Sequence, residues 1–371
     1  MKITKFFSLM LAAALVAVGC ESTPSDKPDV PSTTGAITLE APASIELGQP
    51  INFTVMQEGQ DVTAAATIYE TAGFTAVENP YTPTTTGTFS FYATKGKESS
   101  EIISVTVMAS VPTLPEDEFP ESTKFNHRVL LIDHTGLNCG NCPRVMDGLE
   151  ALAKTDAHMH YNEACVHGGG YAPSSSDKAY SDAAKIVDQF YRPSGYPNIQ
   201  FNFRAGAGDI GYVDNFVKNN TAIINSLVKA EGADAGIAVA ANGDQTAVYV
   251  SIAVKAAVEQ EYRLTAWLLE NDIYNPGQSG ATKDSHKLHQ HALRNIAGAY
   301  SRNDISGDSI GVIAAGQVKE HSFELPIISN KWVVSNMEVL VIVSAPNKNG
   351  QFEVVNTAVC PINSTIGYEY L

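Results

Sequence analysis

The sequence predicts an α/β unit at the centre of the chain, with a β-rich domain on each side of it. Apolar and polar residues alternate at the two-residue period of strands over much of residues 36–110 and 233–371. Between them, an apolar run, a polar turn, two closely spaced cysteines and an amphipathic stretch follow one another from Val129 to Lys154. This order of strand, turn and helix defines the central unit.

The composition limits the size of the protein and its partners. A length of 371 residues suggests two or three domains, and a hydrophobic share of 44% is enough for ordinary cores. Charged residues make up only 17%, and the formal net charge is −16. Such a chain lacks the basic face that nucleic acid requires and is repelled by anionic lipid headgroups. We therefore expect no nucleic acid partner and no electrostatic docking to membranes.

The first residues have the pattern of a lipoprotein signal peptide. Lys2 and Lys5 precede an apolar run from Phe6 to Val18, which is short for a membrane span. The run ends at Gly19-Cys20 and resembles a lipobox, in which Cys20 carries the lipid. We expect residues 1–19 to be the signal peptide and Cys20 to be the lipid attachment site. The alternative is a plain secretory signal with an incidental cysteine.

The next segments predict a tether, a domain and a linker. Residues 20–35 are rich in Pro, Ser, Thr and Asp without apolar periodicity, which predicts a tether. Residues 36–110 contain runs such as 88–93 and 102–107 that alternate like strands, and they predict an immunoglobulin-like sandwich without a disulfide. We interpret it as a spacer or adhesive module. Three prolines and four acids make residues 111–124 a semi-stiff, solvated linker.

The Cys139-Gly140-Asn141-Cys142 motif is the strongest chemical signal. It follows the apolar run and opens the helical stretch, so free amides and the helix dipole favour a thiolate at Cys139. Cys142 lies one turn further on and can resolve a mixed disulfide. Two alternatives stay open. Zinc usually takes four ligands from two such pairs, and the sequence has no second pair. A structural disulfide over so short a loop stabilises little.

The motif and its surroundings resemble thioredoxin-like proteins. Asp133 stands six residues before Cys139, and Gly195-Tyr196-Pro197-Asn198-Ile199 is similar to the segment that carries the cis-proline of that family. The resemblance implies a thioredoxin-like fold for residues 125–232. It also implies that Asp133 accepts the proton of Cys142 and that Pro197, after a cis peptide bond, shapes the peptide-binding edge.

A second resemblance covers the chain from about Phe125 to its C-terminus. His134-Thr135-Gly136, Asn141-Cys142-Pro143 and residues 289–294 resemble lipoproteins related to outer membrane protein 28 of the Bacteroides group. This family implies an outer-membrane lipoprotein with a thioredoxin-like fold and no established substrate. The alternating pattern of residues 233–371 adds a C-terminal β-sandwich domain.

Histidines near these motifs allow a metal interpretation that we do not favour. Alternation would put His289 and His291 on one strand face, near His286, as a two-ligand metal edge. We expect instead that all three pack or face solvent. His134 and His167 suit tuning of the thiolate or metal binding with the cysteines, but the copper-delivery relatives of thioredoxin use a wider cysteine spacing. We therefore predict no metal and no cofactor.

Two cysteines remain, Cys165 and Cys360. An exported protein permits a bridge between them, whereas two buried free thiols are the expectation we favour.

Two function hypotheses follow from the sequence. The first is a thiol–disulfide oxidoreductase that acts on exported proteins, with Cys139 as nucleophile and Cys142 as resolving thiol. The second is a non-enzymatic surface binding or adhesion lipoprotein that keeps the thioredoxin-like fold as a scaffold. The exposure of Cys139 distinguishes them, because an exchange enzyme needs an accessible, acidic thiol and a scaffold does not. Both hypotheses place the chain at the outer membrane through the lipid on Cys20.

Overall fold

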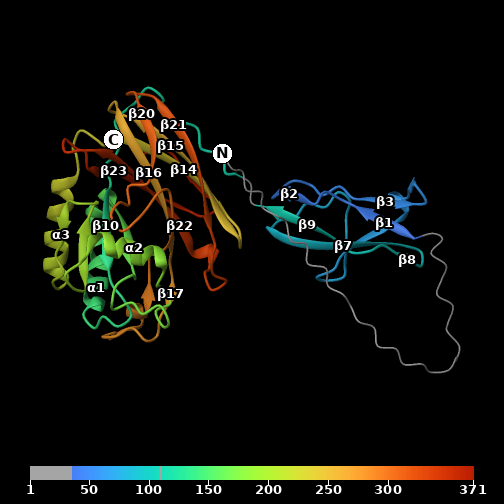
Figure 1. The fold of residues 1–371 in the computed structure, drawn as a ribbon, viewed down its shortest axis with the longest axis horizontal. Helices are drawn as coiled ribbons and strands as arrows, with labels where there is room; N and C mark the ends of the chain where they lie inside the picture. Colours follow the sequence, from blue (N-terminus) through green and yellow to red (C-terminus); the bar gives the residue numbers. More distant parts are fainter. Residues whose placement is uncertain (1–35, 109–110) are drawn as a thin grey trace, which may run out of the picture.

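A computed structural model describes residues 36–108 and 111–371 of the protein (Figure 1). The predicted signal peptide, Cys20 and tether lie outside these residues. The described chain is mostly β-sheet with three α-helices. None of its helices is long and apolar enough to cross a membrane.

The N-terminal strands form a unit of their own, drawn in blue in Figure 1. One sheet has the order β1-β3-β4, and the other has the order β2-β9-β7-β5-β6 with β8 paired to β7. The strands are β1 (Ile37–Glu40), β2 (Ser44–Glu46), β3 (Thr54–Gln57), β4 (Gln60–Asp61), β5 (Thr67–Glu70), β6 (Thr75–Val77), β7 (Gly87–Lys95), β8 (Glu98–Ser99) and β9 (Ile103–Met108).

The two sheets of this unit share one apolar core. Phe53 and Phe91 are fully or almost fully buried, and their rings meet edge to face with centroids 4.8 Å apart. Alternate residues of β9 face this core, as its burial pattern shows. The predicted strands at 88–93 and 102–107 are therefore confirmed as β7 and β9.

The central unit is built around β10 (Val129–His134). Parallel β11 (Tyr161–Val166) pairs with one edge of β10 and antiparallel β12 (Asn198–Phe201) with the other, and β13 (Gly206–Ala207) pairs with β12. The helices are α1 (Cys142–Leu152), α2 (Asp182–Tyr191) and α3 (Val213–Leu227).

The side chains of β10 point alternately to two different cores. Val129 and Leu131 pack with α1 and α3, whereas Leu130 and Ile132 pack with α2. The same alternation continues to the end of the strand, where His134 bonds to Asp188 of α2 and Asp133 lies on the α1 side. A strand that is buried on both faces is apolar at every position, which explains why residues 129–132 are all apolar.

The C-terminal strands continue the central sheet. Strand β19 pairs in parallel with β11 at Cys165 and Ala292, and the complete nine-stranded sheet has the order β13-β12-β10-β11-β19-β16-β22-β23, with β20 on β16. A four-stranded sheet, β21-β15-β14-β24, packs against its C-terminal half over a second apolar core. The strands are β14 (Ala235–Gly243), β15 (Ala247–Ala256), β16 (Gln260–Glu270), β19 (Ala292–Ala297), β20 (Asp308–Ile313), β21 (Val318–Pro326), β22 (Met337–Pro346), β23 (Phe352–Pro361) and β24 (Ser364–Ile366).

The segment predicted as a solvated linker is tied down over part of its length. Lys255 of β15 is 1% exposed, and its Nζ donates to Asp117 Oδ2 at 2.8 Å and to the carbonyls of Phe119 and Pro120. A buried ammonium needs such acceptors, because an unpaired charge inside a protein is very costly. Composition alone did not reveal this partner of the linker.

Candidate functional site

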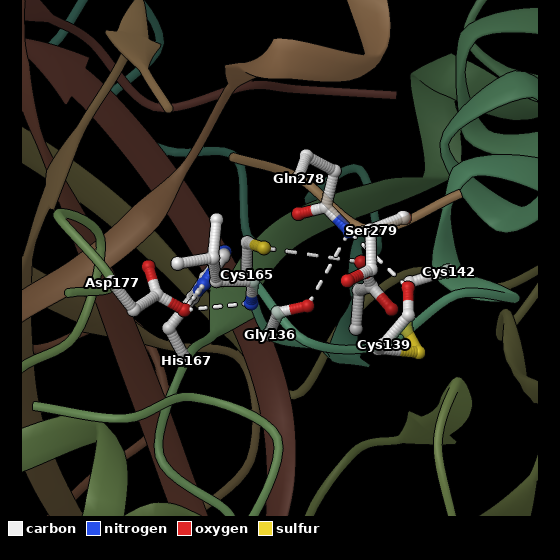
Figure 2. The surroundings of a disulfide bond; sticks show 10 residues. Gly136, Cys139, Cys142, Cys165, His167, Asp177, Gln278 and Ser279 are labelled. Carbon is white, nitrogen blue, oxygen red and sulfur yellow. Dashed lines mark hydrogen bonds and ion pairs between the residues drawn. A yellow bond between two sulfur atoms is a disulfide. The ribbon is translucent and has the colours of Figure 1, made fainter. Parts of the chain in front are cut away.

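The Cys139–Cys142 pair lies at the end of β10, where the chain turns into α1 (Figure 2). The two cysteines form a disulfide with their Cα atoms 5.4 Å apart. Helix α1 begins at Cys142, with Pro143 as its second residue. Proline suits this place because the first amides of a helix have no partner within it.

A loop from the C-terminal part of the chain covers the pair. We call residues 275–281 the strap. Gln278 Nε2 donates to the carbonyl of Cys139 at 3.2 Å, and the amide of Ser279 donates to the carbonyl of Leu137 at 2.8 Å (Figure 2). A side chain on Gly280, whose φ is +72°, would lie 2.0 Å from the carbonyl oxygen of Gly140. The strap therefore packs backbone to backbone on the turn.

Both cysteines of the disulfide are buried. Cys139 is 2% exposed and Cys142 is 1% exposed. The exchange hypothesis requires an accessible Cys139, so the surroundings of the pair have to open before a protein substrate can reach the sulfur. Nothing in the sequence near the motif indicated the strap, because it lies more than 130 residues away in the chain.

Asp177 joins the turn to the strap, and sequence reasoning missed it. Its Oδ2 accepts the amide of Leu137 at 2.8 Å and Nδ1 of His167 at 2.9 Å, and its Oδ1 accepts Nδ2 of Asn275 at 3.0 Å. Burial alone would raise the pKa of Asp177, but His167 and the backbone donors at Leu137 and Ala179 lower it to about 2. The ionised carboxylate thus holds the turn, His167 and the strap together.

Asp133, the predicted proton acceptor, is 2% exposed on the α1 side of β10. Burial, and secondly the charge of Glu163, raise its pKa well above the usual range of a carboxyl. Its hydrogen bond goes to Cys165, whose Sγ donates to Oδ2 at 3.8 Å, and not to either bridged cysteine. Its Oδ1 has no hydrogen-bond partner among the residues that the structure describes.

The Tyr196–Pro197 peptide bond is cis, which confirms the prediction for that bond. Pro197 is buried and directly precedes β12. Asn198, the first residue of β12, pairs with His134 at the end of β10. Pro197 therefore lies at the same end of the sheet as the turn that carries the cysteines.

The three clustered histidines face three different partners, as the packing interpretation expects. His286 Nε2 lies 2.8 Å from Asp147 Oδ1, and His291 Nδ1 bonds to Glu338. The ring of His289 meets the ring of His167 with centroids 4.6 Å apart. The strand alternation that the metal alternative would need is absent here, because His291 has a φ of +53° between two strands.

The structure also places His134 and the two cysteines outside the motif. His134 Nδ1 lies 3.0 Å from Asp188 Oδ1 on the α2 face, away from the disulfide. Over residues 36–108 and 111–371, no three His, Cys, Asp or Glu side chains gather as a metal site. Cys165 and Cys360 are buried free thiols, as we favoured.

Comparisons with known proteins agree with the family resemblance. Residues 184–363 match the family model described as "Outer membrane protein Omp28". This stretch includes most of α2, Pro197 and most C-terminal strands, but not Cys139, Cys142 or Asp133. No curated protein matches the chain.

Solved structures add a likeness in fold. HBP35 of Porphyromonas gingivalis is 18% identical, and the match covers 65% of this chain and 77% of that chain at a TM-score of 0.50. A β-glucosidase from Kluyveromyces marxianus in complex with glucose is 8% identical over 36% of this chain and 15% of its own, at a TM-score of 0.17, too low to support any argument. Residues 184–363 are thus similar to the Omp28 outer membrane proteins, which agrees with the predicted location of the chain at the outer membrane of the cell envelope.

Proposed function

We propose that the Cys139–Cys142 pair exchanges thiols and disulfides with exported proteins, within a thioredoxin-like unit formed by residues 125–232. One observation carries the proposal. The disulfide joins the turn after β10 to the first residue of α1, in a sheet of order β13-β12-β10-β11 with a proline directly before β12. The resemblance to thioredoxin-like proteins implies this order of elements around the cysteines.

The exchange uses two electrons and two sulfur–sulfur bonds. In the reduced protein, the Cys139 thiolate attacks one sulfur of a substrate disulfide and expels the other as a thiolate. The Cys142 thiolate then attacks Cys139 Sγ, which closes the Cys139–Cys142 disulfide and releases the reduced substrate. The same steps in reverse oxidise a substrate dithiol. We assign no direction between them.

Asp133 is suited to hold the proton that Cys142 gives up. Burial raises the pKa of this carboxyl toward the range of a thiol. An acid and a base exchange a proton most readily when their pKa values are close. In the disulfide form the carboxyl bonds to Cys165, so we expect it to serve Cys142 only after reduction has separated the two sulfur atoms.

The test is exchange with a small model disulfide, with the strap left intact. Cys139→Ser abolishes exchange, because the attacking sulfur is gone. Cys142→Ser traps a mixed disulfide on Cys139, because no second thiol resolves it. Cys360→Ser, at a buried thiol far from the pair in sequence, is the matched control and leaves the rate unchanged. The proposal fails if wild-type protein shows no exchange and if Cys139 resists alkylation after reduction.

One observation favours the alternative of a non-enzymatic surface binding lipoprotein. Both sulfur-bearing residues are at most 2% exposed, and an inert disulfide under the strap would suit a scaffold. The reduction potential separates the two functions. A structural disulfide has a potential below about −300 mV, whereas exchange proteins lie between about −270 and −120 mV.

The remaining parts support anchoring and spacing. We infer that residues 36–110 are an immunoglobulin-like spacer on a tether of residues 20–35, that residues 111–124 link it to the thioredoxin-like unit, and that residues 233–371 form a C-terminal β-sandwich domain. Cys20 carries the lipid that holds the chain at the outer membrane. Cys20→Ala releases the protein from membranes, and a mature protein without added lipid mass would contradict this.

A further inference from the structure

A cavity of about 310 Å³ lies between α1 and the segment of residues 285–291. Its floor is made by residues of β10 and β11, next to the redox site but without either bridged cysteine in its lining. We call it the α1 cavity. The proposed exchange chemistry uses only Asp133 among its lining residues.

Three buried side chains that line the α1 cavity carry a polar atom without a hydrogen-bond partner. These atoms are Asp133 Oδ1, Thr135 Oγ1 and His289 Nε2, and each residue is at most 2% exposed. Burial leaves His289 neutral by lowering its pKa to about 3, so Nε2 is able to accept a hydrogen bond. Nearly all buried polar atoms in proteins are paired. Three unpaired acceptors in one cavity therefore indicate a ligand with several donors.

Two acidic groups line the cavity, and the charge of His291 offsets that of Glu163 only in part. Asp133 and Glu163 face the cavity from neighbouring strands, and burial raises the pKa of both. The basic groups nearby are already engaged, since Lys283 and His286 pair with Asp147 and His291 pairs with Glu338. A bound cation would stabilise the ionised carboxylates.

The lining of the cavity also has an apolar part. Apolar side chains contribute from both sides of the cavity, Met146, Leu149 and Ala153 from the α1 side and Leu288 from the opposite segment. Pockets of this kind, mostly apolar with a few convergent polar groups, are typical of sites for small organic ligands. A metal ion alone would leave these apolar side chains without contact, and the described residues contain no cluster of three metal-ligating side chains.

We propose that the α1 cavity binds a primary ammonium group on a short apolar chain. The three N–H donors of a primary ammonium match the acceptors of Asp133, Thr135 and His289. Asp133 and Glu163 supply the counter-charge, and the alkyl chain lies along α1. The same chemistry is found in a free alkylamine and in a lysine side chain of a peptide. The proposal does not depend on thiol exchange.

Titration calorimetry of the full chain with its disulfide intact tests the site, with hexylamine as the probe. We expect saturable binding with one site per chain. Hexanol, which lacks the charge, and trimethylhexylammonium, which lacks the N–H donors, bind at least about tenfold more weakly. Equal binding of hexanol would overturn the proposal, because it would show an apolar pocket only. Zinc displacing hexylamine, or no saturable binding at all, would overturn it as well.

Variants locate the binding. Glu163→Gln weakens the binding of hexylamine about tenfold, because the substitution removes one counter-charge and keeps the shape of the side chain. Glu320→Gln, on an exposed position of β21, is the matched control and leaves binding unchanged. Met146→Trp fills the cavity and abolishes binding. Unchanged binding in both cavity variants, with folding verified by circular dichroism, would place the amine elsewhere and overturn the proposal.

A competition experiment identifies the source of the ammonium group. Nα-acetyl-lysine methylamide displaces hexylamine if the site accepts a lysine side chain of a protein. If hexylamine binds and the lysine derivative does not compete, the ligand is a free amine. Either result supports a primary-ammonium site and assigns its source.

Discussion

The two faces of β10 end in buried polar residues of very different character. On the α2 face, His134 bonds to Asp188, and Asp188 also accepts the hydroxyl of Tyr196 at 2.6 Å. On the α1 face, Asp133 has one weak donor, the thiol of Cys165, and an oxygen without any partner. Among the described residues His134 Nε2 also has no partner, but the carboxylate on the α2 face has two close hydrogen bonds, whereas the carboxylate on the α1 face has one weak one.

The difference separates a structural polar group from a functional one. A paired buried group stabilises a unique packing, whereas a buried carboxyl without a cation costs stability and persists where chemistry or binding uses it. The α2 face has the first character. The α1 face, which carries the proposed proton acceptor and the α1 cavity, has the second. Substitutions on the two faces are therefore expected to act in opposite directions.

The largest effect is expected from Asp188→Ala on the α2 face. The substitution removes the acceptor of buried His134 and half-buried Tyr196, so the free energy of unfolding falls by about 3–5 kcal/mol. Urea unfolding measures the loss. Lys185→Ala, on the exposed side of the same helix, is the control and changes stability by less than about 0.5 kcal/mol. Equal stability of the two variants would contradict a structural role for the α2 face.

The opposite sign is expected from Asp133→Asn on the α1 face. The pKa of Asp133 is raised on folding, so the folded state binds the proton more tightly than the unfolded state does. The loss of stability caused by ionising this buried carboxyl is absent below the unfolded pKa of about 3.9. It grows as the pH rises toward the folded pKa. At pH 8, Asp133→Asn raises the free energy of unfolding by at least about 1 kcal/mol. Thiol–disulfide exchange becomes slower, because the proposed proton acceptor is lost.

Unfolding of wild type and Asp133→Asn across pH 3–9 gives the measurement. The two stability curves converge at acid pH and separate as the pH rises. The opposite result would be a stability of Asp133→Asn, relative to wild type, that falls between pH 4 and pH 8. It would mean that the carboxylate has an unseen partner, and the comparison of the two faces would fail.

The contrast also explains how much the sequence could predict. The run Val129–Ile132, the short spacing of Cys139 and Cys142, and the position of Pro197 depend on local patterns. In the structure the run forms most of β10, and the cysteine turn and Pro197 lie at the same end of the sheet. The outer-membrane family was predicted from short motifs in the same way.

Long-range contacts were beyond such patterns. The strap reaches the cysteine turn from residue 278, and Asp177 bonds to it from a loop that carries no motif. The pairing of β11 with β19 joins segments that read as separate domains, because alternation reports which residues are buried but not which strand lies beside them. His289 and His291 failed as an alternating pair because the left-handed backbone at His291 interrupts the period.

The strap packs on the turn that follows β10. Gln278→Ala tests whether the strap limits access to the disulfide. The variant loses the side-chain donor to the carbonyls of Gly136 and Cys139, at a cost of about 1 kcal/mol. If opening of the strap limits access, reduction of the disulfide by dithiothreitol becomes about fivefold faster, because opening is easier by the same energy. Gln317→Ala, at an exposed position far from the site, is the control. An unchanged rate would mean that the strap does not limit access.

The smallest effect is expected at Cys165, the single donor to Asp133. Cys165→Ala removes that donor and leaves the pocket slightly larger, so stability at neutral pH falls by about 1 kcal/mol. Because the bond from Cys165 lowers the pKa of Asp133, its loss raises that pKa further. The decline of stability with rising pH therefore extends to higher pH than in wild type. Cys165→Ser retains a donor of similar size, and its pH profile stays close to that of wild type. If Cys165→Ala and Cys165→Ser gave the same profile, the thiol would contribute nothing to Asp133, and the α1 face would be less well paired than the structure indicates.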